Sequence, residues 1–164
     1  MSCDAVAFSA MLWMASFNPG QASTAAPAVM QQPAVPQSVA GEPLFQDIVK
    51  RAAQLKAQTE AYRKALAGGD PTAAAKPLKG FDGFSAKIGE LSALDMKGHI
   101  SLRDRGAVDD LKCILRGISQ DLPEKLTAMS AAKTIKDQDL ALRDMTYLLN
   151  DNVEVITAPP QPAA

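Results

Sequence analysis

Hydrophobic side chains recur every three or four positions along this chain from about Pro43 onward. This spacing is the period of an α-helix with one buried side, whereas a half-buried strand would alternate at every second residue. The first such stripe consists of Phe45, Ile48, Ala52, Leu55, Thr59, Tyr62 and Leu66. The pattern predicts a helix that begins after Pro43 and ends at Gly68-Gly69, because glycine commonly follows the last helical residue.

Two segments follow before the middle of the chain. Asp70-Pro71 has the order of a helix N-cap and first residue, and it predicts a short alanine-rich helix that Pro77 interrupts. A longer helix is expected from about Ser85 to Met96, before a turn at Gly98-His99. Its inward residues would be Phe84, Ile88, Leu91 and Leu94.

The last third of the chain predicts two more helices. The inward positions of the third are Val108, Leu111, Leu115, Ile118 and Leu122. We expect a short break or restart at Pro123, because proline disrupts a helix interior and Asp121 with Glu124 resembles a capping box. The fourth helix is expected from about Thr134 to Ile156. It has Leu142, Met145, Leu149, Val153 and Ile156 inward.

Composition supports an all-α fold. Of the 164 residues, 47% are hydrophobic and only 5% aromatic, and much of the hydrophobic share is alanine, which favours helices over strands. We therefore predict an antiparallel bundle of about four helices, the third broken or kinked at Pro123. Asp47 to Lys64 has a net charge of +3 and Lys136 to Glu154 a net charge of −3, so we expect these two helices to lie side by side.

The N-terminal part of the chain is chemically different from the bundle. Residues 1–49 contain no lysine or arginine, and residues 26–41 are rich in Ala, Pro and Gln. We expect a signal-like or disordered leader at 1–41, a bundle at 42–157 and a disordered tail at 158–164. The apolar stretch Ala5–Ala15 has the length of a signal-peptide core and is too short to span a bilayer, although the basic residues that normally precede such a core are missing.

Few residues suggest a reactive or binding site. His99 is the only histidine, and we expect it to be a solvated loop residue rather than a ligand or pH sensor. Cys3 and Cys113 match no metal or redox spacing, and we expect Cys113 to be a bystander thiol, with redox sensing or an intermolecular disulfide as the alternative. Asn150-Asp151-Asn152 lacks the remainder of a calcium loop and is expected to line a polar notch or an exposed face. We predict no catalytic, metal-binding or cofactor-binding residue.

The sequence favours a non-enzymatic, exported protein of bacterial type that acts through an unidentified protein partner or through self-association. Nearly balanced charge, with 17 basic and 18 acidic residues, argues against nucleic acid as the partner. Its location would be periplasmic or secreted, or cytoplasmic if residues 1–26 are no export signal. Two alternatives stay open: a periplasmic bundle that holds a small ligand, metal or haem in its interior, and a cytoplasmic chaperone or adaptor.

Overall fold

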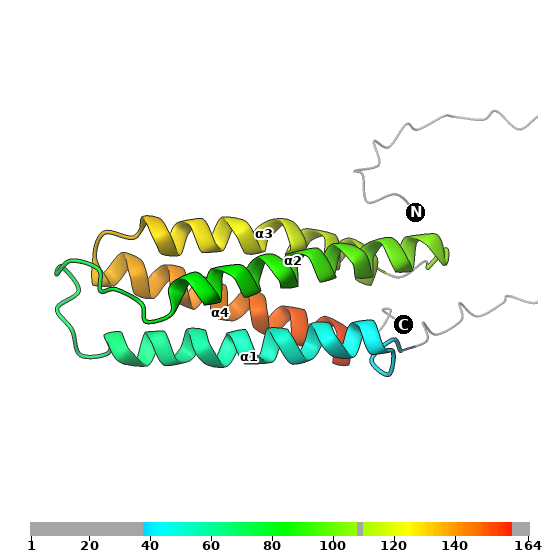
Figure 1. Ribbon diagram of the computed structural model, residues 1–164, viewed down its shortest axis with the longest axis horizontal. Coiled ribbons are helices and arrows are strands. Elements are labelled where there is room, and N and C mark those ends of the chain that lie inside the picture. Colours follow the sequence, from blue (N-terminus) through cyan, green and yellow to red (C-terminus); the bar gives the residue numbers. More distant parts are fainter. Residues whose placement is uncertain (1–37, 108–109, 159–164) are drawn as a thin grey trace, which may run out of the picture. The chain divides into compact units, whose positions relative to one another are not determined.

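A computed structural model describes residues 38–107 and 110–158 of the chain. These residues form four α-helices and no strand: α1 (Pro43–Leu66), α2 (Phe81–Asp104), α3 (Leu111–Ala131) and α4 (Ile135–Thr157). Figure 1 shows the four helices lying side by side with their axes nearly aligned. The predicted all-α bundle is confirmed. The leader and tail predictions for residues 1–37 and 159–164, and the inward position of Val108, fall outside the described residues.

The helices form a ring in chain order. α1 packs against α2 and α4, and α3 packs against the same two helices, so α2 and α4 face each other across a diagonal. The predicted pairing of the basic first helix with the acidic last helix is confirmed. It includes Arg63 Nε, which donates to Asp139 Oδ1 at 2.9 Å, and Lys56 Nζ, which donates to Asn150 Oδ1 at 2.7 Å.

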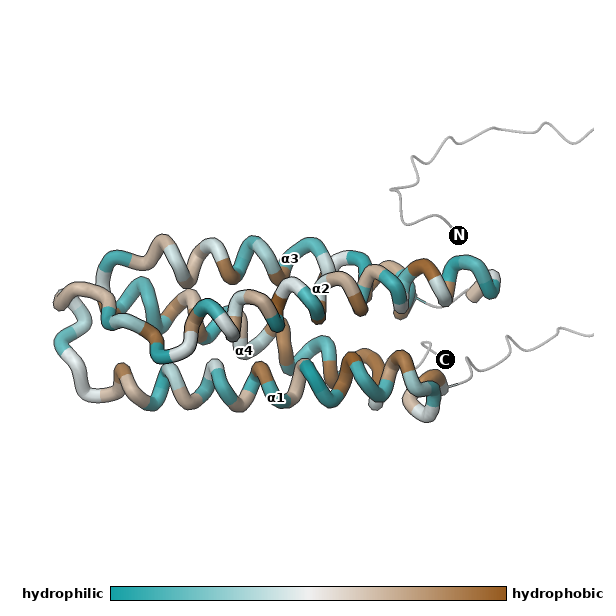
Figure 2. Tube along the Cα trace, viewed as in Figure 1, coloured by the Kyte–Doolittle hydropathy of each residue, from teal (hydrophilic) through white to brown (hydrophobic). Residues whose placement is uncertain are grey.

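A continuous hydrophobic core runs along the inside of the bundle. The seven inward positions predicted for α1 are its seven buried residues. Figure 2 shows hydrophobic and hydrophilic positions alternating along each helix. Each fully buried Leu, Ile, Phe or Met contributes about 1.5 to 3 kcal/mol relative to an exposed one. The largest fully buried side chains are Phe45, Ile48, Phe84, Ile88, Leu91, Leu102, Leu115, Leu122, Leu142, Met145, Leu149 and Ile156.

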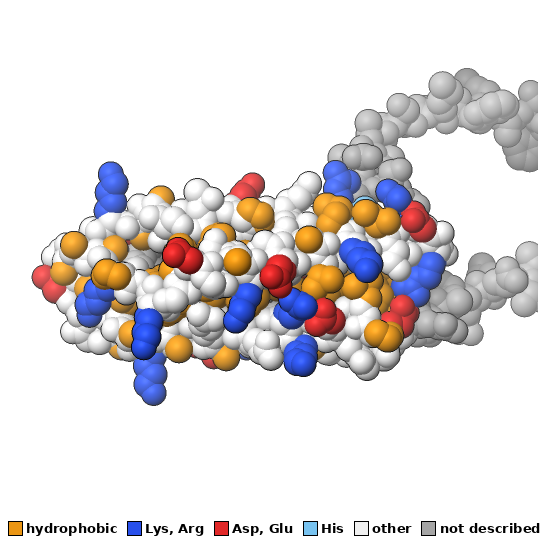
Figure 3. Space-filling view, viewed as in Figure 1, with side chains coloured by type: hydrophobic (Ala, Val, Ile, Leu, Met, Phe, Trp, Pro, Cys, Tyr) orange, Lys and Arg blue, Asp and Glu red, His pale blue; other side chains and the backbone are white. Residues whose placement is uncertain are grey.

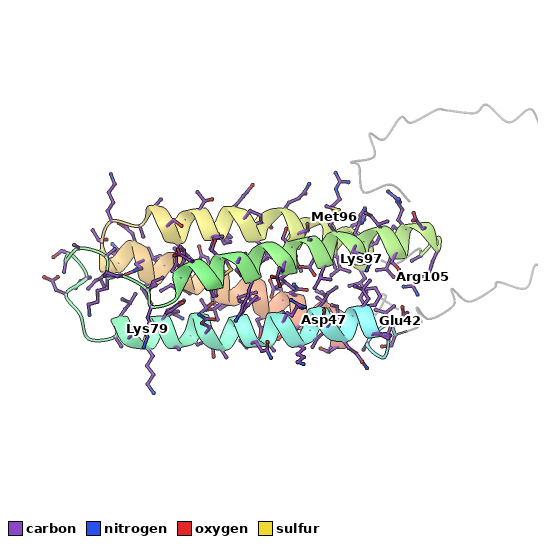
Figure 4. The ribbon with its side chains drawn as sticks, viewed as in Figure 1. Glu42, Asp47, Lys79, Met96, Lys97 and Arg105 are labelled. Carbon is purple, nitrogen blue, oxygen red and sulfur yellow. The ribbon has the colours of Figure 1, made fainter. Side chains whose placement is uncertain are left out.

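Polar contacts fix two ends of the helices. Thr134 caps α4, because its Oγ1 accepts from the backbone N–H of Asp137 at 3.1 Å. At the beginning of α1, Glu42 forms an ion pair with Arg105 at 2.9 Å, and the Arg105 guanidinium lies 6.0 Å from the centre of the Phe45 ring. Figure 4 shows Glu42 and Arg105 at the same end of the bundle.

The short helix predicted after Asp70-Pro71 is wrong. The Asp70 carboxylate instead accepts from the backbone N–H and the hydroxyl of Thr72, which forms a local turn. The backbone that follows pairs with the α3–α4 connection: Ala75 N–H donates to the Lys133 carbonyl, and Ile135 N–H donates to the Ala73 carbonyl. These longer-range bonds replace the intrahelical bonds that so short a helix could not maintain.

The break predicted at Pro123 is also wrong, since α3 continues through it. Pro123 has no N–H to donate to the carbonyl of Ser119, four residues earlier. That carbonyl accepts instead from Ser92 Oγ of α2 at 2.7 Å. A hydroxyl from the neighbouring helix therefore satisfies the group that the proline leaves free.

The predicted turn at Gly98-His99 is a third error, because α2 extends through both residues. A Cβ at Gly98 would lie 3.1 Å from Leu115 Cδ1 and 3.4 Å from Ile48 Cδ1. Glycine here allows close packing of α2 on its neighbours rather than ending the helix.

No helix in the described parts of the chain combines the length and the apolar character needed to cross a membrane.

Candidate functional site: a buried polar pair and an acidic groove

The centre of the bundle contains a carboxyl group and an amide in direct contact. Asp95 on α2 and Asn152 on α4 are both 0% exposed. Asn152 Nδ2 donates to Asp95 Oδ2 at 2.8 Å. Because α2 and α4 are diagonal partners in the ring, this hydrogen bond crosses the middle of the core.

Each of these two side chains also has one oxygen without a hydrogen-bond partner among the described residues. These atoms are Asp95 Oδ1 and Asn152 Oδ1, and both are buried. Burial raises the pKa of Asp95 to about 8, and the hydrogen bond from Asn152 opposes that rise only in part. The pair is therefore set up to favour a protonated carboxyl near neutral pH.

This pair was not predicted from the sequence, although a signal was present. Asp95 continues the buried stripe of Phe84, Ile88 and Leu91 at the expected spacing of three and four. Asn152 lies in the stripe of α4 between Leu149 and Ile156 in the same way. A polar residue in register with each of two apolar stripes indicates a buried polar contact, because such groups must find partners. The prediction that residues 150–152 line a notch or an exposed face holds for Asp151 and is wrong for Asn152.

A second feature is an open groove of about 370 Å³ between α3 and α4. Hydrophobic side chains from both helices line it, and Gly117 leaves space between them. Its rim is acidic. The lining residues are Ile114, Gly117, Ile118, Asp121, Leu148, Asp151, Glu154 and Val155.

The rim of this groove has uncompensated negative charge. Asp121, Asp151 and Glu154 make no ion pair within the described ranges, and no lysine or arginine lines the groove. Glu154 accepts one hydrogen bond, from Asn150 Nδ2 at 2.7 Å. The apolar floor and the carboxylates together favour a ligand that is apolar on one side and basic at its edges.

The groove between α1 and α2 differs in charge. It has a volume of about 340 Å³ and includes Arg51, which pairs with Asp47 at 3.0 Å and with Glu90 at 2.8 Å. On the face seen in Figure 3, basic and acidic side chains lie beside each other. Because these charges largely neutralise one another, this second groove offers a weaker electrostatic signal.

The structure places His99 and Cys113 away from the roles expected for them. His99 is buried, and its Nδ1 lies 2.6 Å from the carbonyl oxygen of Lys112 on α3. Since a carbonyl oxygen only accepts, Nδ1 must carry a proton. The expectation of a solvated loop histidine is wrong. Cys113 is half-buried and disulfide-bonded, so the expected bystander thiol is also wrong.

Within residues 38–107 and 110–158, no group of three or more His, Cys, Asp or Glu side chains could hold a metal ion. No protein-family model matches this chain, and comparisons with curated proteins and with solved structures find no significant similarity. The buried pair and the acidic groove are the most distinctive features of the described residues.

Proposed function

We propose that this protein is a non-enzymatic binding module whose α3–α4 groove holds an amphipathic, basic helix of a partner protein. The groove carries the proposal, because it combines an apolar floor with three carboxylates that form no ion pair with any described residue. A partner helix would bury its own apolar stripe on Ile114, Leu148 and Val155, and lysine or arginine at its edges would meet the carboxylates. Helices bind apolar grooves in this way in many complexes.

Charge distinguishes this occupant from two others that the chain itself could supply. Residues 1–37 contain no lysine or arginine, so this segment has no basic side chain to meet the acidic rim. Helix α1 of a second copy is basic, but its apolar stripe is buried in its own bundle. Its Arg51 and Arg63 already have acidic partners as well. A separate partner with an exposed apolar stripe fits better than either.

Export is the second part of the proposal. The apolar stretch Ala5–Ala15, followed by Asn18-Pro19-Gly20 and small residues, supports it. N-terminal sequencing and intact-mass measurement of the native protein test this part. Recovery of the protein from outside the cytoplasm is expected, and an intact Met1 on cytoplasmic material would contradict export.

The docking site is tested by photo-crosslinking from the groove in living cells. A crosslinker at Leu148 is expected to label a lysine- or arginine-rich helical segment of another protein. Asp151→Lys should abolish that product. The matched control is Glu124→Lys on α3, which reverses a charge that is also exposed but lies outside the groove, and it should leave the product unchanged.

Two outcomes would overturn this assignment of the groove. A crosslinked product that consists of two copies of this chain would replace the partner by self-association. Equal labelling in Asp151→Lys and Glu124→Lys would show that the acidic rim does not select the partner. Circular dichroism of both variants establishes that the bundle is intact.

A further inference from the structure

We propose that the centre of the bundle is a proton-binding site. In the folded protein, the Asp95 carboxyl is protonated and donates a hydrogen bond to Asn152, so that two hydrogen bonds join the side chains of α2 and α4. The proposal is independent of the groove and of any partner. Its ligand is the proton itself.

The arrangement of donors and acceptors carries this inference. An ionised aspartate only accepts hydrogen bonds, and an asparagine side chain has donors on Nδ2 and an acceptor at Oδ1. One contact is in place, from Asn152 Nδ2 to Asp95 Oδ2. The buried atoms left unsatisfied are Asp95 Oδ1 and Asn152 Oδ1, which are both acceptors. A single proton on Asp95 Oδ1 turns one of these acceptors into a donor, and a hydrogen bond from it to Asn152 Oδ1 would satisfy both atoms.

Burial makes the ionised alternative costly. Asp95 is fully inaccessible to solvent, and the one group bonded to it among the described residues is a neutral amide. A buried carboxylate without a cation or several hydrogen-bond donors normally becomes protonated instead. The pKa of Asp95, raised to about 8 by burial, agrees with this argument from geometry.

Two titratable side chains, His99 of α2 and Lys112 of α3, have other partners. His99, one turn beyond Asp95 on α2, directs Nδ1 to the Lys112 carbonyl. The Lys112 ammonium donates to the Ala107 carbonyl. Neither side chain forms a hydrogen bond or an ion pair with Asp95 in the described structure.

The charged groups on α1 and α4 near the pair also bond to other residues or face solvent. Lys56 of α1 reaches α4 near the pair, but its ammonium donates to Asn150 Oδ1 at 2.7 Å and lies 3.9 Å from Glu60. On α4, Asp151 is exposed on the groove and Glu154 accepts from Asn150. Among the described residues, no lysine, arginine or histidine forms an ion pair or a hydrogen bond with Asp95.

The pH dependence follows with a definite sign. An unfolded aspartate has a pKa near 3.8, and the folded value is higher, so the folded state binds one more proton between about pH 4 and pH 8. The contribution of Asp95 to stability is complete below about pH 4 and is lost progressively up to about pH 8. Across that window, the unfolding equilibrium constant should rise by up to about tenfold per pH unit from this group.

The Asp95→Asn variant keeps the shape of the buried pair but removes its titratable proton. An asparagine at this position can donate to Asn152 Oδ1 and accept from Nδ2, as the protonated acid does, without binding a proton. We expect the pH dependence of the variant's unfolding equilibrium to be smaller than that of the wild type by one proton. At pH 7 we expect it to unfold less readily than the wild type, by up to about a thousandfold in the unfolding constant, because it does not have to take up a proton on folding.

The measurement is urea unfolding from pH 4.5 to 8 for three proteins: wild type, Asp95→Asn, and Glu124→Gln as the control that neutralises an exposed carboxylate outside the groove. The control should keep the wild-type slope. The side-chain carboxyl ¹³C shift of Asp95 in the wild type gives a direct readout, expected to titrate near pH 8. Titration below about pH 5, or an Asp95→Asn slope equal to that of the wild type, would overturn the proposal.

Discussion

The contact between Ser92 and the Ser119 carbonyl makes a quantitative prediction about how α3 tolerates Pro123. Ser92→Ala removes the hydroxyl that donates to this carbonyl at 2.7 Å. Because Pro123 has no N–H, the carbonyl also has no intrahelical donor. A backbone carbonyl left unsatisfied beside buried side chains costs about 1 to 3 kcal/mol, and we expect Ser92→Ala to lower the free energy of unfolding by that amount.

The same substitution should cost much less when Pro123 is replaced. In Pro123→Ala, the N–H of residue 123 can donate to the Ser119 carbonyl within the helix. Ser92→Ala then removes a second bond to an already satisfied oxygen and should cost only about 0.5 to 1 kcal/mol. The difference predicts a coupling energy of about 0.5 to 2 kcal/mol between the two sites, within the range measured for residues that share a partner.

Urea unfolding followed by circular dichroism measures the free energy of unfolding of the four proteins in this double-mutant cycle: wild type, Ser92→Ala, Pro123→Ala and the double variant. Ser130→Ala is the matched control, because its hydroxyl also donates to a carbonyl, that of Leu126 at 3.0 Å, but the site is exposed. It should change the free energy of unfolding by no more than about 0.5 kcal/mol. The reasoning is refuted if Ser92→Ala costs the same with and without Pro123, or if it costs no more than Ser130→Ala.

Other substitutions test the close approach of α2, the cap of α4 and the buried carboxyl. Gly98→Ala is expected to lower the free energy of unfolding by about 1 to 3 kcal/mol, because its Cβ would lie 3.1 Å from Leu115 Cδ1. The control, Gly89→Ala, places its Cβ where nothing lies within 4 Å, and it should raise the free energy of unfolding by about 0.5 to 1 kcal/mol. Equal effects in thermal unfolding would contradict tight packing at residue 98. Thr134→Ala should cost about 1 kcal/mol and speed amide exchange in the first turn of α4; unchanged exchange there would show that the cap contributes little. Because the folded pKa of Asp95 is raised to about 8, the wild-type free energy of unfolding should fall by up to about 1.4 kcal/mol per pH unit from pH 4 to 8. A free energy of unfolding that stays constant or rises over this pH range would contradict the raised pKa.

Helix existence and inward faces could be predicted because they depend on local periodicity. The stripe from Phe45 to Leu66 is buried as expected, and so are Leu142, Met145 and Leu149 on α4. The opposite net charges of the first and last helices also gave their neighbour relation correctly. In each case the information lies in the spacing or the summed charge of a continuous segment.

The helix breaks could not be predicted in the same way, because neighbouring helices override local preferences. Pro123 normally interrupts a helix, but Ser92 compensates for the donor it lacks. Gly98 normally weakens a helix, but its missing side chain allows α2 to approach Leu115 and Ile48. Both compensating contacts come from other helices, which a reading of one segment at a time does not include.

The candidate sites depend even more on tertiary contacts. Asp95 and Asn152 are 57 residues apart, and only the diagonal arrangement of α2 and α4 joins them. The acidic groove likewise combines Asp121 of α3 with Asp151 and Glu154 of α4. The polar interruptions in the two stripes could have identified the pair. The groove had no comparable signal, because exposed carboxylates on two helices are ordinary until the helices are placed side by side.

Three polar contacts from α2 specify how this helix sits against its neighbours. Ser92 bonds to α3, Asp95 bonds to α4, and His99 bonds to α3 again. A shift of α2 by one turn would replace many apolar contacts with equivalent ones, since its stripe repeats every three to four residues. The same shift would separate all three polar groups from their partners, at a cost of about 1 to 3 kcal/mol for each buried group left unsatisfied. The apolar core therefore supplies most of the stability, while these contacts select one register among similar ones. Because α2 bonds to both α3 and α4, that register also fixes the two helices whose side chains form the acidic groove.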